Sequence, residues 1–134
     1  MRRPVPALLA LAALAAVPRA AHGADLYVVC NPGVTLQAAD VRDVFLGDKG
    51  FAGSVKLAPA DNTTAQALFL ERVLKLDAAR YSAIWTKKSF REGANPPPVK
   101  ASDAEATAYV RQTPGGCSYV TTAPGAGVTQ VGKY

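Results

Sequence analysis

Two separated segments of this chain constrain its fold more than any others: Leu36–Gly47 (LQAADVRDVFLG) and Gln112–Val120 (QTPGGCSYV). In the first segment, Val41, Val44 and Phe45 recur at the spacing of one helix face, and the closing glycine suits the position just beyond a helix C-terminus. The second segment is typical of a helix end followed by a Pro-Gly turn and a strand. Together they predict a domain in which helices and short strands alternate.

The first 23 residues have the features of a secretory signal peptide. Two N-terminal arginines precede Leu8–Val17, an apolar run that is too short to span a bilayer as a stable helix. Ala21 and Gly23 are small residues at cleavage-site positions, so we expect cleavage after Gly23, with an uncleaved anchor as the alternative. We therefore predict that residues 24–134 form a single domain, periplasmic or secreted, with no membrane insertion after cleavage.

Cleavage also changes the charge balance. The full chain has 15 Lys and Arg against 10 Asp and Glu, a net charge of +5. Three of the arginines belong to the predicted leader and all the acidic residues remain, so the net charge falls to +2. The basic residues are scattered and are not interleaved with stacking aromatics, which argues against a nucleic-acid partner.

Catalytic and metal chemistry are not expected in the mature chain. Its only histidine, His22, belongs to the predicted leader, so histidine-based nucleophilic catalysis lacks its base. The acidic pairs Asp40/Asp43 and Asp103/Glu105 fit a helix surface and a capping turn. We predict a protein that is not an enzyme and that needs no metal or cofactor.

Cys30 and Cys117 are the only two cysteines, and both lie in the predicted mature chain. An even cysteine count in an exported chain favours a disulfide, with two free thiols as the alternative.

The remaining sequence continues the alternation of strands and helices. Strands are predicted at residues 25–30, 55–60, 99–101, 117–121 and 128–133. Three further helices are predicted. The first is opened by the N-cap residue types of 61–64 and runs to about residue 75, and the second begins after Asp77. The third begins at the S-x-x-E capping box of 102–105. Tyr81, Ile84 and Trp85 share one face of the second of these helices and are interpreted as core, with a binding platform as the alternative. The proline-rich segment 91–98 is expected to be a stiff connector. This order favours an α/β three-layer sandwich.

The segments 36–47 and 112–120, in this order, resemble the second lobe of phosphate-type periplasmic binding proteins. That lobe usually carries a "(L/I)xx(I/V)FxG" helix early and a "PGAIGYV"-like strand late. The resemblance covers residues 26–131 and implies a short, single-lobe member of that family. The fold it implies is a three-layer α/β/α sandwich with a mixed sheet of about five strands, like one lobe of a type II periplasmic binding protein. In that lobe the entering strand runs antiparallel to the late strand, which would bring Cys30 and Cys117 within bonding distance.

The same resemblance directs attention to Asp61, Asn62, Thr63 and Thr64, where a predicted strand meets a predicted helix start. Backbone N–H groups and the positive end of a helix dipole make such a junction a natural anion site. The resemblance implies that Asp61 accepts a hydrogen bond from protonated phosphate and that Thr64 offers a hydroxyl. Tyr119 is expected toward the same end of the sheet as a further ligand contact, with a core or surface tyrosine as the alternative.

The anion-binding pattern of that family is incomplete here. The position of its arginine falls near Pro59, and its glycines are replaced by Asn62 and Thr63. A plain helix N-cap is therefore the alternative interpretation of the segment.

The function implied is that of an exported solute-binding-like protein related to the substrate-binding components of phosphate ABC transporters. It would bind phosphate or another oxyanion weakly at a helix N-terminus. A homodimer facing across the site would restore the enclosure that a second lobe normally provides. The alternative is a protein–protein interaction module without a small ligand, accessory to an envelope transporter or sensor.

Overall fold

The computed structural model describes residues 2, 4 and 24–134. Apart from Arg2 and Pro4, the predicted leader lies outside the described residues. Among the residues described, no helix combines the length and the apolar character that a membrane crossing requires.

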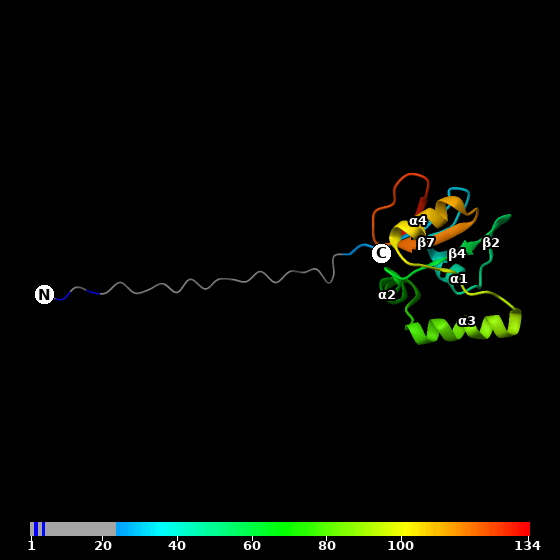
Figure 1. Cartoon of the computed structure of the whole chain (residues 1–134), viewed down its shortest axis with the longest axis horizontal. Coiled ribbons are helices and arrows are strands. Elements are labelled where there is room, and N and C mark those ends of the chain that lie inside the picture. Colours follow the sequence, from blue (N-terminus) through cyan, green and yellow to red (C-terminus); the bar gives the residue numbers. More distant parts are fainter. Residues whose placement is uncertain (1, 3, 5–23) are drawn as a thin grey trace.

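A mixed four-stranded sheet forms the centre of the domain, in the order β4-β7-β1-β8 (Figure 1). Strand β1 (Tyr27–Cys30) pairs antiparallel with β7 (Gly116–Val120) on one side and with β8 (Thr129–Lys133) on the other. Strand β4 (Ala58–Pro59) runs parallel to β7. The sheet thus joins the two ends of the described domain, because its N-terminal strand lies between the last two strands of the chain.

Two pairs of short strands accompany this sheet. Strands β2 (Phe51–Ala52) and β3 (Val55–Lys56) form a hairpin. Strands β5 (Asp61–Asn62) and β6 (Val99–Lys100) pair in parallel.

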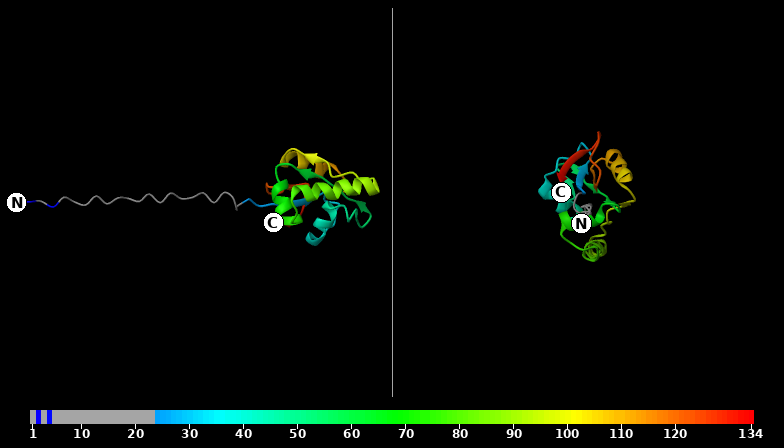
Figure 2. Two further views of the ribbon diagram at one scale, coloured as in Figure 1. Left: turned by 90° about the horizontal axis from the view of Figure 1, so that it is seen from below. Right: turned by 90° about the vertical axis from the view of Figure 1, so that its left-hand side faces the viewer.

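The helical segments cover both faces of the sheet. Helix α1 (Val41–Phe45) follows a 3-10 turn, η1 (Ala38–Asp40), and α2 (Gln66–Phe69) continues into a π-helical segment, η2 (Leu70–Leu74). Helices α3 (Ala78–Glu92) and α4 (Asp103–Gln112) are longer and lie on opposite sides of the domain (Figures 1 and 2).

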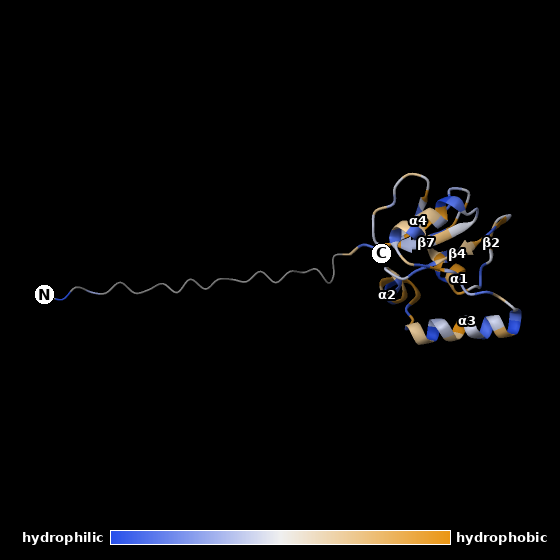
Figure 3. Ribbon diagram, in the orientation of Figure 1, coloured by the Kyte–Doolittle hydropathy of each residue, from blue (hydrophilic) through white to orange (hydrophobic). Residues whose placement is uncertain are grey.

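Each face of the sheet has its own core because side chains alternate along a strand. Val28 and Cys30 of β1 belong to the larger core, which also takes in buried residues of α1, α2 and α3. Val29 points the other way and packs in a smaller core with Ala106 and Val110 of α4. Figure 3 shows that α2 is largely hydrophobic, whereas α3 mixes hydrophilic and hydrophobic residues. The buried residues of α3 are Tyr81 and Trp85.

Several predictions of how the helices begin and end are confirmed. Asp77 caps α3 by accepting a hydrogen bond from the backbone N–H of Arg80 at 2.7 Å, and Ser102 caps α4 through Glu105 N–H at 3.1 Å. Gly47 follows the α1 region with a φ of 76°. The mixed α/β class is confirmed, but the principal sheet has four strands rather than about five.

The predicted helix start at residues 61–64 is wrong. Helix α2 begins at Gln66, its N-cap is Ala65, and no side chain caps it. The backbone of this segment has another partner, because Asp61 N–H donates to the Pro98 carbonyl at 2.8 Å and Thr63 N–H donates to the Lys100 carbonyl at 2.9 Å. These residues are of types that suit a helix cap, but here they pair with β6 instead.

The predicted disulfide is present. Cys30 and Cys117 are bonded and stand directly opposite each other in the β1–β7 register. The bond joins residues 87 positions apart, so it ties the first strand to the late strand of the same sheet.

Removal of this disulfide should lower the free energy of unfolding, mainly because the unfolded chain gains conformational entropy when the loop is no longer closed. Closing a loop of this length stabilises a protein by about 4 kcal/mol in the chain-entropy model. We expect a double Cys30→Ala/Cys117→Ala variant to lose up to that amount of unfolding free energy. Denaturant unfolding measures the loss, and reduced wild type should match the variant. Equal stability of the oxidised and reduced chains would contradict this account.

Gly115 is a second position where the β7 strand is sensitive to substitution. Its φ is +78°, and an added Cβ would collide with the backbone carbonyl of Lys56. Gly53 has a φ of +62° with open space around it, so it is a matched control for the backbone term alone. We expect Gly53→Ala to lower the free energy of unfolding by about 1 kcal/mol and Gly115→Ala to lower it clearly more. Urea unfolding measures both changes. Equal costs would show that the close approach of Gly115 to Lys56 is unimportant.

Candidate functional site

Asp61 lies where the chain stops pairing with β7 and begins to pair with β6. Ala58 N–H donates to the Gly115 carbonyl at 2.9 Å and Ala60 N–H donates to the Cys117 carbonyl at 2.8 Å, so the chain up to residue 60 runs along β7. From Asp61 onward it pairs with β6 instead. This switch places the side chain of Asp61 between the sheet and α3.

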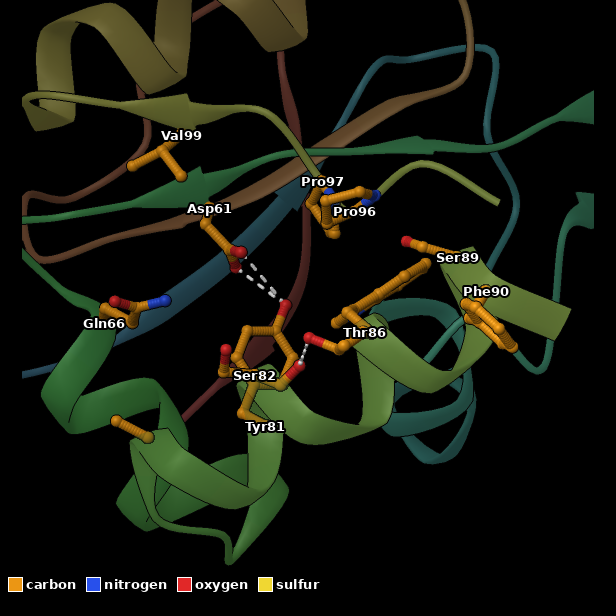
Figure 4. A pocket seen from close by; sticks show the side chains of 12 residues that line it. Asp61, Gln66, Tyr81, Ser82, Thr86, Ser89, Phe90, Pro96, Pro97 and Val99 are labelled. Atoms are coloured by element: carbon orange, nitrogen blue, oxygen red, sulfur yellow. Dashed lines mark hydrogen bonds between the residues drawn. The ribbon is translucent and has the colours of Figure 1, made fainter. Parts of the chain in front are cut away.

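The carboxylate of Asp61 is held by two tyrosine hydroxyls. Tyr119 Oη donates to Oδ1 at 2.8 Å. Tyr81 Oη lies 3.1 Å from Oδ1 and 3.0 Å from Oδ2 (Figure 4). Asp61 is 4% exposed and Tyr119 is fully buried. The cluster thus joins β5, β7 and α3 through one buried carboxylate.

Aromatic packing fixes the orientation of Tyr119. Its ring stacks on Phe69 of α2 with a centroid separation of 3.9 Å and lies 5.6 Å from Phe45 of α1. Phe45 and Phe69 meet edge to face at 4.8 Å. These contacts leave the Tyr119 hydroxyl one direction in which to find a partner, and that partner is Asp61.

Burial sets the charge states of this cluster. Desolvation raises the pKa of Asp61, and the hydrogen bonds from Tyr119 and Tyr81 oppose that rise. Burial and the nearby Asp61 charge raise the pKa of both tyrosines, so their hydroxyls stay protonated and act as donors. The groups that hydrogen-bond to the Asp61 carboxyl are therefore neutral hydroxyls, and no cation is among them.

A cavity of about 710 Å³ lies between α3, β5 and the proline-rich connector, and the Asp61 side chain forms part of its wall. Figure 4 shows the lining side chains. They are Asp61, Gln66, Ala78, Tyr81, Ser82, Trp85, Thr86, Ser89, Phe90, Pro96, Pro97 and Val99. Ser82, Thr86 and Phe90 are exposed, so the cavity opens to solvent along α3.

The cavity has one acidic group and no basic one in its lining. The described residues form three ion pairs, Arg80–Asp77, Lys88–Asp48 and Lys133–Asp25, and none involves Asp61. The local electrostatic field therefore favours hydrogen-bond donors and positive charge over anions.

Of the residues predicted as ligand contacts, Asp61 and Tyr119 are joined directly through their side chains. Asn62 is fully buried; its amide donates to Asp103 Oδ1 at 2.7 Å and to the Tyr119 carbonyl at 2.9 Å. Thr63 and Thr64 are exposed, and the Thr64 hydroxyl donates to the Ala101 carbonyl at 3.3 Å. The segment is not a helix N-terminus, because α2 begins at Gln66, and of the five predicted contacts only Asp61 lines the cavity.

Sequence reasoning assigned Tyr81 and Trp85 to the core, and both are buried. It missed the contact between the Tyr81 hydroxyl and Asp61. The available signal was the hydroxyl itself, since a tyrosine on an inner helix face needs a polar partner. The Trp85 indole satisfies the same need by donating to the Phe45 carbonyl at 3.0 Å.

Among residues 2, 4 and 24–134, no group of three or more potential metal ligands was found. No protein-family model matches the chain, and no curated protein matches it.

The raised pKa of Asp61 predicts a dependence of stability on pH with a definite sign. Below the ordinary value of 3.8 the carboxyl is protonated in both the folded and the unfolded chain, so its burial involves no charge. As the pH rises through the higher folded pKa, ionisation penalises the folded state, and the unfolding free energy should fall. We expect Asp61→Asn to lack this fall, as measured by urea unfolding across the acidic range.

Tyr119→Phe sharpens the test. It removes a hydroxyl that lowers the Asp61 pKa, so the fall in stability should extend to higher pH than in wild type. Parallel wild-type and Asp61→Asn curves would contradict a desolvated carboxyl at this position.

Proposed function

We propose that this chain is an exported solute-binding-like protein, related to one lobe of the phosphate-type periplasmic binding proteins, and that its ligand binds in the Asp61 cavity. The layout of helices on both faces of a mixed sheet fits a reduced three-layer sandwich of that kind. Under this proposal the protein works in the periplasm or outside the cell, and its role is binding rather than catalysis.

The observation that carries the proposal is the position of the Asp61 carboxylate. It is buried, it is oriented by two tyrosine hydroxyls, and it forms part of the wall of a cavity of about 710 Å³. This volume lies within the usual range of small-molecule sites. A single oriented polar group in a largely apolar pocket is a common way to fix the orientation of a solute.

Phosphate is the ligand that the family resemblance suggests, and Asp61 fits one part of its recognition. A carboxylate accepts hydrogen bonds, so it can bind an oxyanion that still carries a proton. The lining supplies no basic side chain to neutralise the oxyanion charge. We therefore expect phosphate to bind weakly, through the protonated oxygen.

A second candidate function is an interaction module, and exposed apolar side chains favour it. Phe90 is 92% exposed and Val99 is 63% exposed, and both line the same cavity. An envelope protein or a second copy of this chain that inserts a side chain between them would bury both.

The proposal predicts that phosphate stabilises the mature chain more than sulfate does. Phosphate retains protons near neutral pH and can donate to Asp61, whereas sulfate cannot. At a hundred times the Kd a ligand adds about 2.7 kcal/mol to the unfolding free energy. Thermal unfolding with increasing concentrations of each anion at matched ionic strength measures the difference, and Asp61→Asn should abolish it.

Thr64→Ala is the matched control at the originally predicted cradle, and it should leave the phosphate effect intact. Equal effects of phosphate and sulfate, or an effect that survives in Asp61→Asn, would rule out Asp61 as the recognition group. The absence of stabilisation by phosphate, by 2-phenylethylamine and by 2-phenylethanol would favour the interaction module. Self-association that is lost in Phe90→Asp would then support it.

A further inference from the structure

The negative charge of Asp61 has no counter-charge among the described residues. It belongs to none of the three ion pairs, and its hydrogen-bond donors are two neutral hydroxyls. A buried carboxylate in this state is costly, because the attraction that normally offsets desolvation is missing. A positively charged ligand would supply that attraction inside the cavity.

The carboxylate also has unused hydrogen-bonding capacity. A carboxylate offers about four acceptor positions, and two tyrosine hydroxyls can donate only two protons. The Tyr119 proton goes to Oδ1, and the Tyr81 proton is shared between the two oxygens. Oδ2 thus receives the smaller share and is the atom on which an N–H donor from the cavity would act.

The rest of the lining suits an apolar body attached to that donor. Trp85, Pro96, Pro97 and Val99 offer apolar surface, and Phe90 at the open end is an aromatic side chain without cover. The polar lining residues other than Asp61 are neutral, such as Ser82 and Ser89 of α3. The charge is therefore concentrated at one end of a site that is otherwise apolar or neutral.

We propose that the Asp61 cavity binds a primary ammonium group carried on a small apolar or aromatic body. This inference rests on the proposed solute-binding function and names the ligand class of the same site. The ammonium donates to Asp61 Oδ2 and neutralises its charge, while the body of the ligand covers Phe90 and the apolar wall. A neutral alcohol of the same shape makes the hydrogen bond without the neutralisation, and an anion meets repulsion from Asp61.

The test compares three probes on the mature, oxidised protein: 2-phenylethylamine, 2-phenylethanol and inorganic phosphate. Isothermal titration calorimetry should give a Kd for the amine that is about tenfold or more below that of the alcohol. Both probes can donate a hydrogen bond to the carboxylate, but only the ammonium adds the attraction between opposite charges. Asp61→Asn should remove that advantage. Asp25→Asn, which deletes an acidic group outside the cavity, should leave it unchanged.

A further variant keeps the carboxylate and blocks access to it. Thr86→Phe enlarges an exposed α3 residue of the cavity lining, so it should weaken amine binding while thermal unfolding of the free protein stays close to wild type. This variant keeps the proposal testable if Asp61→Asn proves unstable.

The outcomes separate this inference from the proposed function. Equal affinity for amine and alcohol, or amine binding that survives in both Asp61→Asn and Thr86→Phe, overturns the inference. Binding of phosphate alone that depends on Asp61 leaves the solute-binding proposal standing and overturns the ammonium assignment. If none of the three probes binds, both proposals fail.

Discussion

The antiparallel pairing of β1 with β7, which the Cys30–Cys117 bond makes covalent, is the constraint on which the rest of the structure depends. The pairing joins residues 87 positions apart, and every helical segment of residues 24–134 lies between Cys30 and Cys117. It sets the register of β7, and the other edge of β7 hydrogen-bonds to the chain up to Ala60. The same register directs Cys117 and Tyr119 to the larger core, since they are two residues apart on one strand. A slip of one residue would turn both to the face covered by α4.

The larger core then accommodates a charged group within an apolar environment. Stacking of Tyr119 on Phe69 is ordinary core packing, but the tyrosine also carries a hydroxyl that must be satisfied. Asp61 satisfies it, and Tyr81 contributes a second donor from α3. The arrangement stabilises the carboxylate only in part, because hydrogen bonds from neutral hydroxyls do not replace a counter-charge. The domain thus retains an unfavourable electrostatic feature at the wall of a cavity, which is the usual location of functional groups with shifted pKa values.

How far the sequence could predict this structure depended on the distance over which each interaction acts. The caps at Asp77 and Ser102 were predictable because the side chain and the N–H it accepts from are three residues apart. The disulfide was predictable because only two cysteines were available and the family resemblance supplied the strand order. The helix start at residues 61–64 was wrong because its competitor, β6, lies far along the chain and is only two residues long. Asp61 was singled out by residue type, but its environment could not be derived, since Tyr81 contacts it only after α3 has docked.

The openness of the cavity along α3 links the proposed functions. An electrostatic contact is strong only where water is excluded, and the Asp61 end of the cavity already meets that condition at 4% exposure. The Phe90 end does not, because that side chain is 92% exposed. A strong electrostatic contact with the carboxylate therefore requires that the outer part of α3 be covered as well. The apolar body of a ligand or a second protein surface could provide this cover. The two candidates differ in what provides this cover: a ligand in the solute-binding proposal, and a second protein surface in the interaction module. A ligand that carries both a donor for Asp61 and the apolar cover in one molecule would meet this need without a second protein surface.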